Sequence, residues 1–243
     1  MKKYLIASVA LLFFTIISRG QSKKESLYPY TLSITPRINS AGYFPFTGAI
    51  LNRNTNVDLN VIFQKRGYGF LAFKSLDLED KKSDINYLQS AVFKQFRVSK
   101  TVQVGLFFGY LFSQISEFKD VVGSDYFGAW TVYWDINKKL RLENIMLITD
   151  VSTQQKIVNR ILILYTVKKF RLNLSLHQRE VPEINNFSAS GSFGISLPKL
   201  KIVNKVSTQF TAAYQTYITA NRPDFALKDG FLFSLAFPIE INQ

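Results

Sequence analysis

The sequence contains no cysteine, and its 12 glycines and 7 prolines are few for a chain of 243 residues. Without cysteine the chain has no disulfide framework, no thiolate zinc site and no N-terminal cysteine for lipid attachment. The glycine and proline content excludes a fibrous protein. Charged residues make up 19% of the chain and hydrophobic residues 47%, which is too apolar for a disordered protein. The length fits one folded domain.

Long apolar runs are also scarce. The sequence has one, at residues 4–18, directly after Lys2 and Lys3. This run is shorter than the roughly 20 residues that a transmembrane helix needs. A basic start, a short apolar core and small residues at Ser18 and Gly20 predict an export signal over residues 1–20, removed by cleavage. No later run is long enough for a transmembrane helix, so any membrane insertion of the mature chain must use strands.

Alternation with a period of two dominates from residue 46 onward. In residues 101–113, for example, Val102 and Phe108 fall on one face, whereas Gln103 and Ser113 fall on the other. Most of the segments are longer than a common strand and match the roughly 9 to 11 residues that cross a bilayer at a tilt. We expect twelve strands, at 46–53, 56–64, 67–75, 85–98, 101–114, 125–136, 139–149, 155–167, 170–180, 184–197, 205–219 and 228–241.

The connections between these strands alternate in character. One set is short and basic, with Lys65-Arg66, Lys100, Lys138-Lys139, Lys168-Lys169, Lys199 and Lys201. The other set is mostly longer and acidic, with Asp77, Glu79, Asp80, Asp84, Glu117, Asp120, Asp125, Asp150, Glu180, Glu183, Asp224 and Asp229. Successive connections of an antiparallel sheet lie at opposite ends, so the two sets predict two chemically different ends of one object. With twelve strands, both chain termini fall at the short-turn end.

On these features the mature chain resembles the bacterial outer-membrane β-barrel class of Gram-negative cells. The resemblance rests on the export signal, the even strand count, the alternation, the unequal connections and aromatic strand ends such as Trp134 and Phe170. It implies an all-β fold, an antiparallel transmembrane barrel of about twelve strands with short periplasmic turns and longer outer loops. It also implies outer-membrane lipids and the barrel assembly machinery as partners. A soluble exported sandwich or lipocalin-like barrel is the alternative, with its apolar face turned inward.

Three regions follow from this interpretation. Residues 1–20 are the signal peptide, residues 21–45 are an N-terminal tail or partial plug, and residues 46–243 form the barrel. Prolines at positions 29, 36 and 45 interrupt the second region, which leaves a periplasmic tail, an extra short strand and a partial plug as open alternatives.

Four arginines are the candidate lumen-lining residues. If the apolar face meets lipid, Arg141, Arg160, Arg171 and Arg179 share the lumen face of three successive strands. Such a group would favour anionic solutes, and in kind it resembles the basic lumens of twelve-stranded porins for acidic oligosaccharides. The arginines could instead pair with Glu143 and other acceptors to hold a narrow barrel shut. We therefore expect a porin-like, passive, anion-leaning channel for small solutes, or else a closed barrel serving structure, adhesion or assembly.

Other chemistry is weakly represented. Ser175 and the single histidine, His177, lie two residues apart on the lumen face, whereas twelve-stranded outer-membrane phospholipases carry the reverse order on a lipid-facing strand. A lipid hydrolase is thus a distant alternative, and we expect no enzyme. The acidic stretch 77–84 lacks the ligand pattern of a calcium-binding EF-hand loop, so we expect neither a metal nor another cofactor. Although the chain is basic, no nucleic-acid-binding motif follows the export signal.

Overall fold

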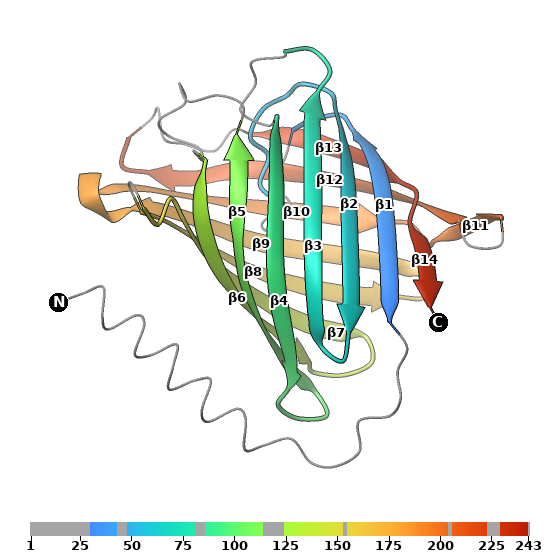
Figure 1. Ribbon diagram of the computed structural model, residues 1–243. Helices are drawn as coiled ribbons and strands as arrows, with labels where there is room; N and C mark the ends of the chain where they lie inside the picture. Colours follow the sequence, from blue (N-terminus) through green and yellow to red (C-terminus); the bar gives the residue numbers. More distant parts are fainter. Residues whose placement is uncertain are drawn as a thin grey trace.

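The computed structural model describes residues 30–42, 48–80, 86–113, 124–152, 155–203, 206–222 and 229–242 (Figure 1). The predicted signal peptide, residues 1–20, lies outside the described residues. The strands are β1 (Thr31–Asn39), β2 (Asn56–Lys65), β3 (Tyr68–Asp77), β4 (Tyr87–Arg97), β5 (Val102–Ser113), β6 (Asp125–Asp135), β7 (Leu140–Thr149), β8 (Lys156–Val167), β9 (Phe170–Val181), β10 (Asn186–Ser196), β11 (Leu200–Val203), β12 (Val206–Ala220), β13 (Gly230–Ala236) and β14 (Ile239–Asn242). A short 3₁₀ turn, η1 (Pro182–Ile184), joins β9 to β10. Among the described residues, no helix is long and apolar enough to cross a membrane.

The strands form one closed antiparallel barrel. β1 to β10 pair in sequence order, β10 pairs with β12, and β12 pairs with β13. The wall closes where β1 pairs with β13 and β14 on one side and with β2 on the other. β13 and β14 share one position in the wall, and β11 extends the turn before β12 as a short hairpin. Within the described residues the wall has twelve strand positions, which confirms the predicted barrel.

Side chains alternate between the outside and the interior, as the period of two predicts. On β5, Phe108 is 59% exposed whereas Leu111 is 2% exposed. On β9, Leu174 is 53% exposed whereas His177 is 1% exposed. The outer rows are therefore apolar around the wall, and polar side chains point inward. The soluble alternative, with its apolar face inward, is wrong for this chain.

The two ends differ as the connections predict. At one end, which we call the turn end, strands are joined by tight hairpins (Figure 1). Arg66 and Gly67 have φ of 50° and 78°, as the two central residues of a type I′ turn require. Thr31 of β1 pairs with Asn242 of β14 at this end. The first strand therefore begins, and the last strand ends, at the turn end. The longer connections lie at the opposite, loop end. Four of the expected loop carboxylates, Asp84, Glu117, Asp120 and Asp224, lie outside the described residues.

The strand assignments need three corrections. The first strand of the wall is β1, which lies within the region 21–45 and matches the extra-strand alternative for it. Residues 48–53, expected as part of the first strand at 46–53, lie outside the strands, and Ala49 and Ile50 are buried inside the barrel. The last expected strand is divided into β13 and β14, because Phe237 and Pro238 interrupt it.

Two prolines meet at the closing seam. The backbone N–H of Phe237 donates to the carbonyl oxygen of Pro36 over 2.9 Å. The backbone carbonyl group of Pro36 therefore points toward the break between β13 and β14. The N–H that Pro36 lacks would point to the same place, where Pro238 already interrupts the ladder. β1 therefore tolerates a proline with little loss of pairing.

Candidate functional site

The interior of the barrel has two unlike walls. The inward rows of β3 to β7 carry the apolar wall, an apolar cluster formed by Phe73, Tyr87, Ala91, Leu111, Phe127, Ala129, Ile145 and Leu147. Gly109 makes room for this cluster, because a Cβ there would lie 2.7 Å from the tip of the Phe127 ring and 2.1 Å from the carbonyl oxygen of Ser90. Phe127 is 1% exposed and Leu147 is fully buried, so this part of the interior is packed like a protein core.

Hydroxyl, amide and imidazole groups cover the opposite side. We call the inward rows of β9, β10 and β12 the polar wall, whose buried members are Ser175, His177, Asn186, Ser188, Ser190, Ser196 and Gln215. Ser188 and Ser190 are fully buried, and neither side-chain oxygen has a hydrogen-bond partner among the described residues. β8 lies between the two walls. Its Val158 packs against the apolar cluster, and its Arg160 faces the interior two residues further along.

The connection between β1 and β2 enters the barrel. We call its described residues 48–55 the inner segment. Ile50 is 2% exposed and packs with Ala41 and Leu232, whereas Leu51 packs against the apolar wall. The N–H of Ile50 donates to Oε1 of Gln215 over 3.0 Å, and Nε2 of Gln215 donates to the carbonyl oxygen of Ile50 over 3.3 Å. Gln215 thus ties the inner segment to the polar wall by completing the hydrogen bonds of one buried residue.

The far end of the inner segment is anchored at the loop end. Oδ2 of Asp77 accepts hydrogen bonds from the side-chain amides of Asn52, over 3.3 Å, and Asn54, over 2.8 Å. The N–H of Thr55 donates to the Glu79 carboxylate over 2.7 Å. Asp77 also accepts at Oδ1 from the backbone N–H groups of Glu79 and Asp80. Asp77 and Glu79, from the acidic stretch that we compared with a calcium-binding loop, therefore accept hydrogen bonds from backbone and side-chain amide groups. Among the described residues, no group of three or more His, Cys, Asp or Glu could hold a metal ion.

The four candidate arginines lie on inward rows but at different depths. Arg171 is the second residue of β9 and is exposed at the turn end, whereas Arg179 lies near the loop end of the same strand. Arg141 and Arg160 approach one carboxylate, Glu143, with guanidinium nitrogens 4.0 and 3.6 Å from its oxygens. The structure thus brings two of the four together and spreads the others along the wall. That they line a conducting pore stays a prediction.

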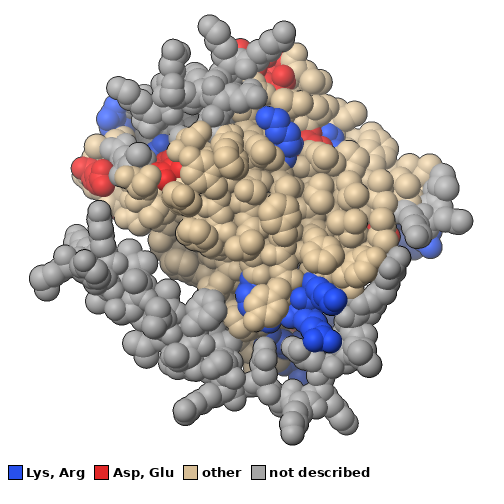
Figure 2. Space-filling view, in the orientation of Figure 1, with Lys and Arg blue, Asp and Glu red and all other residues tan. Residues whose placement is uncertain are grey.

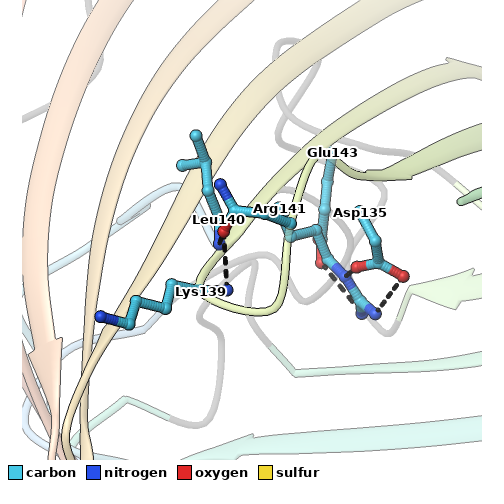
Figure 3. Close-up of polar contacts among 6 residues, drawn as sticks. Asp135, Lys139, Leu140, Arg141 and Glu143 are labelled. Carbon is cyan, nitrogen blue, oxygen red and sulfur yellow. Dashed lines mark hydrogen bonds and ion pairs between the residues drawn. The ribbon is translucent and has the colours of Figure 1, made fainter.

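Arg141 is already paired near the turn end. Its Nε and Nη2 donate to the two oxygens of Asp135 over 2.5 and 3.1 Å, and Figure 3 shows the guanidinium between Asp135 and Glu143. Both side chains of this Arg141–Asp135 pair remain well exposed, at 44% and 40%. Arg141 is therefore largely neutralised, and its effect on a passing ion is screened by water.

Arg160 lies close to Gly48 of the inner segment. Its side chain is 13% exposed, and a Cβ added to Gly48 would lie 3.9 Å from its Nη1. Gly48 has φ of 70°, so the inner segment turns beside this guanidinium in a conformation that side chains disfavour. Arg160 thus lies between Glu143 of the wall and the inner segment.

Ser175 and His177 do form a hydrogen bond, with 3.0 Å between Oγ and Nε2. Ser175 Oγ also lies 2.5 Å from Ser192 Oγ, so the serine belongs to a hydroxyl network on two strands. Nδ1 of His177 has no hydrogen-bond partner among the described residues. A hydrolase would need an acidic or amide group there to orient the ring. The pair therefore has the geometry of a polar core contact.

A charged cluster on β1 and β2 escaped the sequence analysis. Asp58 has a fully buried side chain, which accepts from Nε of Arg37 over 2.8 Å and from Nδ2 of Asn39 over 2.7 Å. Arg37 also lies over the Phe73 ring, with 5.8 Å to its centroid. Arg37 was missed because β1 was not recognised as a strand. The alternation in β2, which places Asp58 opposite Val57 and Leu59, was the available signal.

Solved structures with a similar fold are outer-membrane proteins. The KdgM porin aligns with a TM-score of 0.57 at 8% identity, covering 85% of this chain and 98% of that protein. An outer-membrane channel from Pseudomonas putida F1 aligns with a TM-score of 0.52 at 8% identity, covering 91% of this chain and 98% of the channel. No protein-family model and no curated protein matches the sequence. The chain thus has the fold of outer-membrane β-barrels.

Proposed function

We propose that this protein is a passive outer-membrane channel for small solutes, with a leaning toward anions set at Arg160. The observation that carries the proposal is the position of Arg160 between Glu143 and the inner segment. A loop folded into a barrel narrows its interior, and a guanidinium at the narrowing acts on every ion that passes. The proposal includes outer-membrane location after export by the cleaved segment 1–20, and insertion by the barrel assembly machinery.

The similar folds support a channel in general terms. The KdgM porin has also been solved in complex with disordered oligogalacturonate, a polyanion, and its alignment with this chain has a TM-score of 0.56. For the present chain we propose only the broader class of small anionic solutes, because the inward groups beside the inner segment are Arg160, its partner Glu143 and the neutral hydroxyl and amide groups of the polar wall. No cofactor is needed for passive permeation.

The test is conductance in a planar bilayer with an ion gradient. We expect Arg160→Ala to move the reversal potential toward cation preference and Glu143→Gln to move it toward stronger anion preference, because each removes one charge beside the inner segment. Arg141→Ala is the matched control, since it removes the same charge from a side chain that is 44% exposed near the turn end, where water screens it. A folded barrel that stays electrically silent would exclude the channel.

A closed barrel serving structure, adhesion or assembly is the second candidate. The apolar wall favours it, because its large side chains are almost completely buried inside the barrel. A silent barrel with a loss of envelope integrity on deletion of its gene would support this candidate. A lipid hydrolase is disfavoured, because the Ser175–His177 pair faces inward and lacks an orienting group among the described residues. Lipase activity abolished by His177→Ala would reverse that judgement.

A further inference from the structure

The turn end carries a ring of unpaired positive charge. Seven exposed basic residues lie in four successive hairpin turns, and we call them the basic ring: Lys65, Arg66, Lys100, Lys138, Lys139, Lys168 and Lys169. Among the described residues, none of these side chains takes part in an ion pair. At this end, in the described part of the chain, Asp135 is paired with Arg141 and Glu240 with Lys199 over 2.8 Å. At the lower end of the tan surface in Figure 2, the visible charged side chains are basic.

Aromatic side chains mark a level on the outer surface just inside the basic ring. Tyr68, Trp134, Tyr165 and Phe170 are on outer rows within a few residues of the turns, with exposures of 64, 46, 43 and 42%. Aromatic girdles of this kind sit where acyl chains meet headgroups. The basic ring, which is further toward the turn tips, therefore lies at the level of lipid phosphates.

Lys94 shows that cations are stabilised on the outer surface at this level. Its Nζ lies 3.4 Å from the centroid of the Tyr68 ring and 5.6 Å from that of Phe96. The same ammonium donates to the carbonyl oxygen of Arg66 over 3.1 Å. Lys94 thus joins the aromatic level to the β2–β3 turn and fixes the place of Arg66 relative to the bilayer.

We infer that the basic ring binds anionic phospholipid headgroups of the leaflet at the turn end. The charges are spread over four turns along the barrel rim and do not converge on one pocket, which fits a plane of headgroups better than a single soluble ligand. No carboxylate of the described ranges forms an ion pair with them, and headgroup phosphates attract lysines within a Debye length. The inference needs only the barrel in a membrane, so it is independent of whether the barrel conducts.

The experiment compares lipid association around the full chain folded in phosphatidylcholine bilayers. Spin-labelled phosphatidylglycerol and spin-labelled phosphatidylcholine are added separately, and the motionally restricted fraction gives their relative association constants. We expect phosphatidylglycerol to associate about threefold to tenfold more strongly, with the preference falling as salt rises.

The variant replaces Lys65, Lys100, Lys138 and Lys139 together by Gln. Arg66 and Lys168 are left unchanged because their φ values of 50° and 54° make those positions sensitive to substitution. We expect the variant to lose most of the preference, whereas Lys199→Gln, whose charge is already paired with Glu240, keeps it. A heat-modifiable gel shift checks that each variant folds.

Two results would overturn the inference. Equal association of the two lipids with the unmodified protein would leave the basic ring to another partner, such as an acidic periplasmic protein. A preference that survives in the fourfold variant would place the lipid site elsewhere. Should the fourfold variant fail to fold, Lys138→Gln with Lys139→Gln repeats the test on one turn, with about half the loss expected.

Discussion

The two inner walls of the barrel differ although their outer rows are alike. Leu147 of the apolar wall and Ser190 of the polar wall are both fully buried, yet one packs in an apolar cluster and the other is a hydroxyl without a partner among the described residues. Outside the barrel, Phe108 on β5 and Phe193 on β10 are exposed to the same degree, at 59% and 56%. The surrounding lipid therefore explains the outer rows on both sides, but it does not explain the inner difference.

The difference between the two inner walls assigns the stability of the barrel to the apolar wall and the proposed solute path to the polar wall. Close packing in the apolar wall excludes water and stabilises the barrel, whereas buried hydroxyl and amide groups contribute little stability unless they are hydrogen-bonded. In the proposed channel, the solute path follows the polar wall, past Arg160 and the inner segment. The predictions below test that division, beginning with the largest effect.

Truncation in the apolar wall should be the most costly change. Phe127→Ala would leave a cavity among Phe73, Leu111 and their neighbours, with an expected loss of about 3 to 5 kcal/mol in the free energy of unfolding. Ser190→Ala on the polar wall is the control and should change it by less than about 1 kcal/mol. Urea unfolding in lipid vesicles, followed by the heat-modifiable gel shift, measures both. Equal losses would mean that the walls do not differ in packing.

The Asp58 cluster should be the next most sensitive site. Asp58→Asn would leave Arg37, whose side chain is 22% exposed, without its ion pair. Because Arg37 retains some contact with water, we expect a loss of about 2 to 3 kcal/mol, at or below the lower end for breaking a buried pair. Asp135→Asn breaks the exposed pair with Arg141 and should cost less than about 1 kcal/mol. The same unfolding assay distinguishes them, and a larger cost at Asp135 would contradict the burial argument.

Gln215 should control the inner segment more than the barrel itself. Gln215→Ala leaves the buried N–H and carbonyl oxygen of Ile50 unpaired, which weakens the local attachment by about 1 to 3 kcal/mol. If the barrel conducts, release of the inner segment from the polar wall should raise the single-channel conductance and the current noise. Gln209→Ala, on the same inward row of β12, is the control and should leave conductance unchanged. An unchanged conductance in Gln215→Ala would show that the inner segment does not limit the path.

The smallest effect is expected on the outer surface. Asn144 is on the outer row of β7, where its side chain donates to Oδ1 of Asn159 over 2.8 Å and to the carbonyl oxygen of Arg160 over 3.2 Å. Asn144→Leu exchanges these bonds for contact with lipid, so the free energy of unfolding should change by at most about 1 kcal/mol. A large loss in the unfolding assay would mean that the outer rows, too, carry specific structure.

Most of the wall could be predicted from alternation, because the lipid-facing side chains form an apolar row at every second residue of each strand. The expected strand 101–114 is β5 at Val102–Ser113, and 170–180 is β9 at Phe170–Val181. β1 was missed because Pro36 argues against a central strand, and only the matching break at Pro238 makes it acceptable. Residues 48–53 were misassigned because a short apolar run has the same pattern in a strand and in a loop buried inside a barrel.

The site was less accessible to sequence reasoning. Alternation placed Arg141 and Arg160 on one face, and the register brings both to Glu143, the partner that the sequence offered. It did not indicate that Gly48 approaches Arg160 or that Gln215 binds Ile50. These contacts join residues more than a hundred positions apart in the sequence, and their geometry depends on how the inner segment folds, which no local pattern encodes.

The pairing of β1 with β13 and β14 determines when the barrel can close during synthesis of the chain. β1 is the first described strand and its partners β13 and β14 are the last, as in the pair Thr31 and Asn242. Until β13 and β14 have been synthesised, β1 keeps one unpaired edge that can pair with another strand. Closure of the barrel must therefore follow synthesis of β13 and β14. A chain that stopped before residue 230 would remain an open sheet, which cannot reside in lipid.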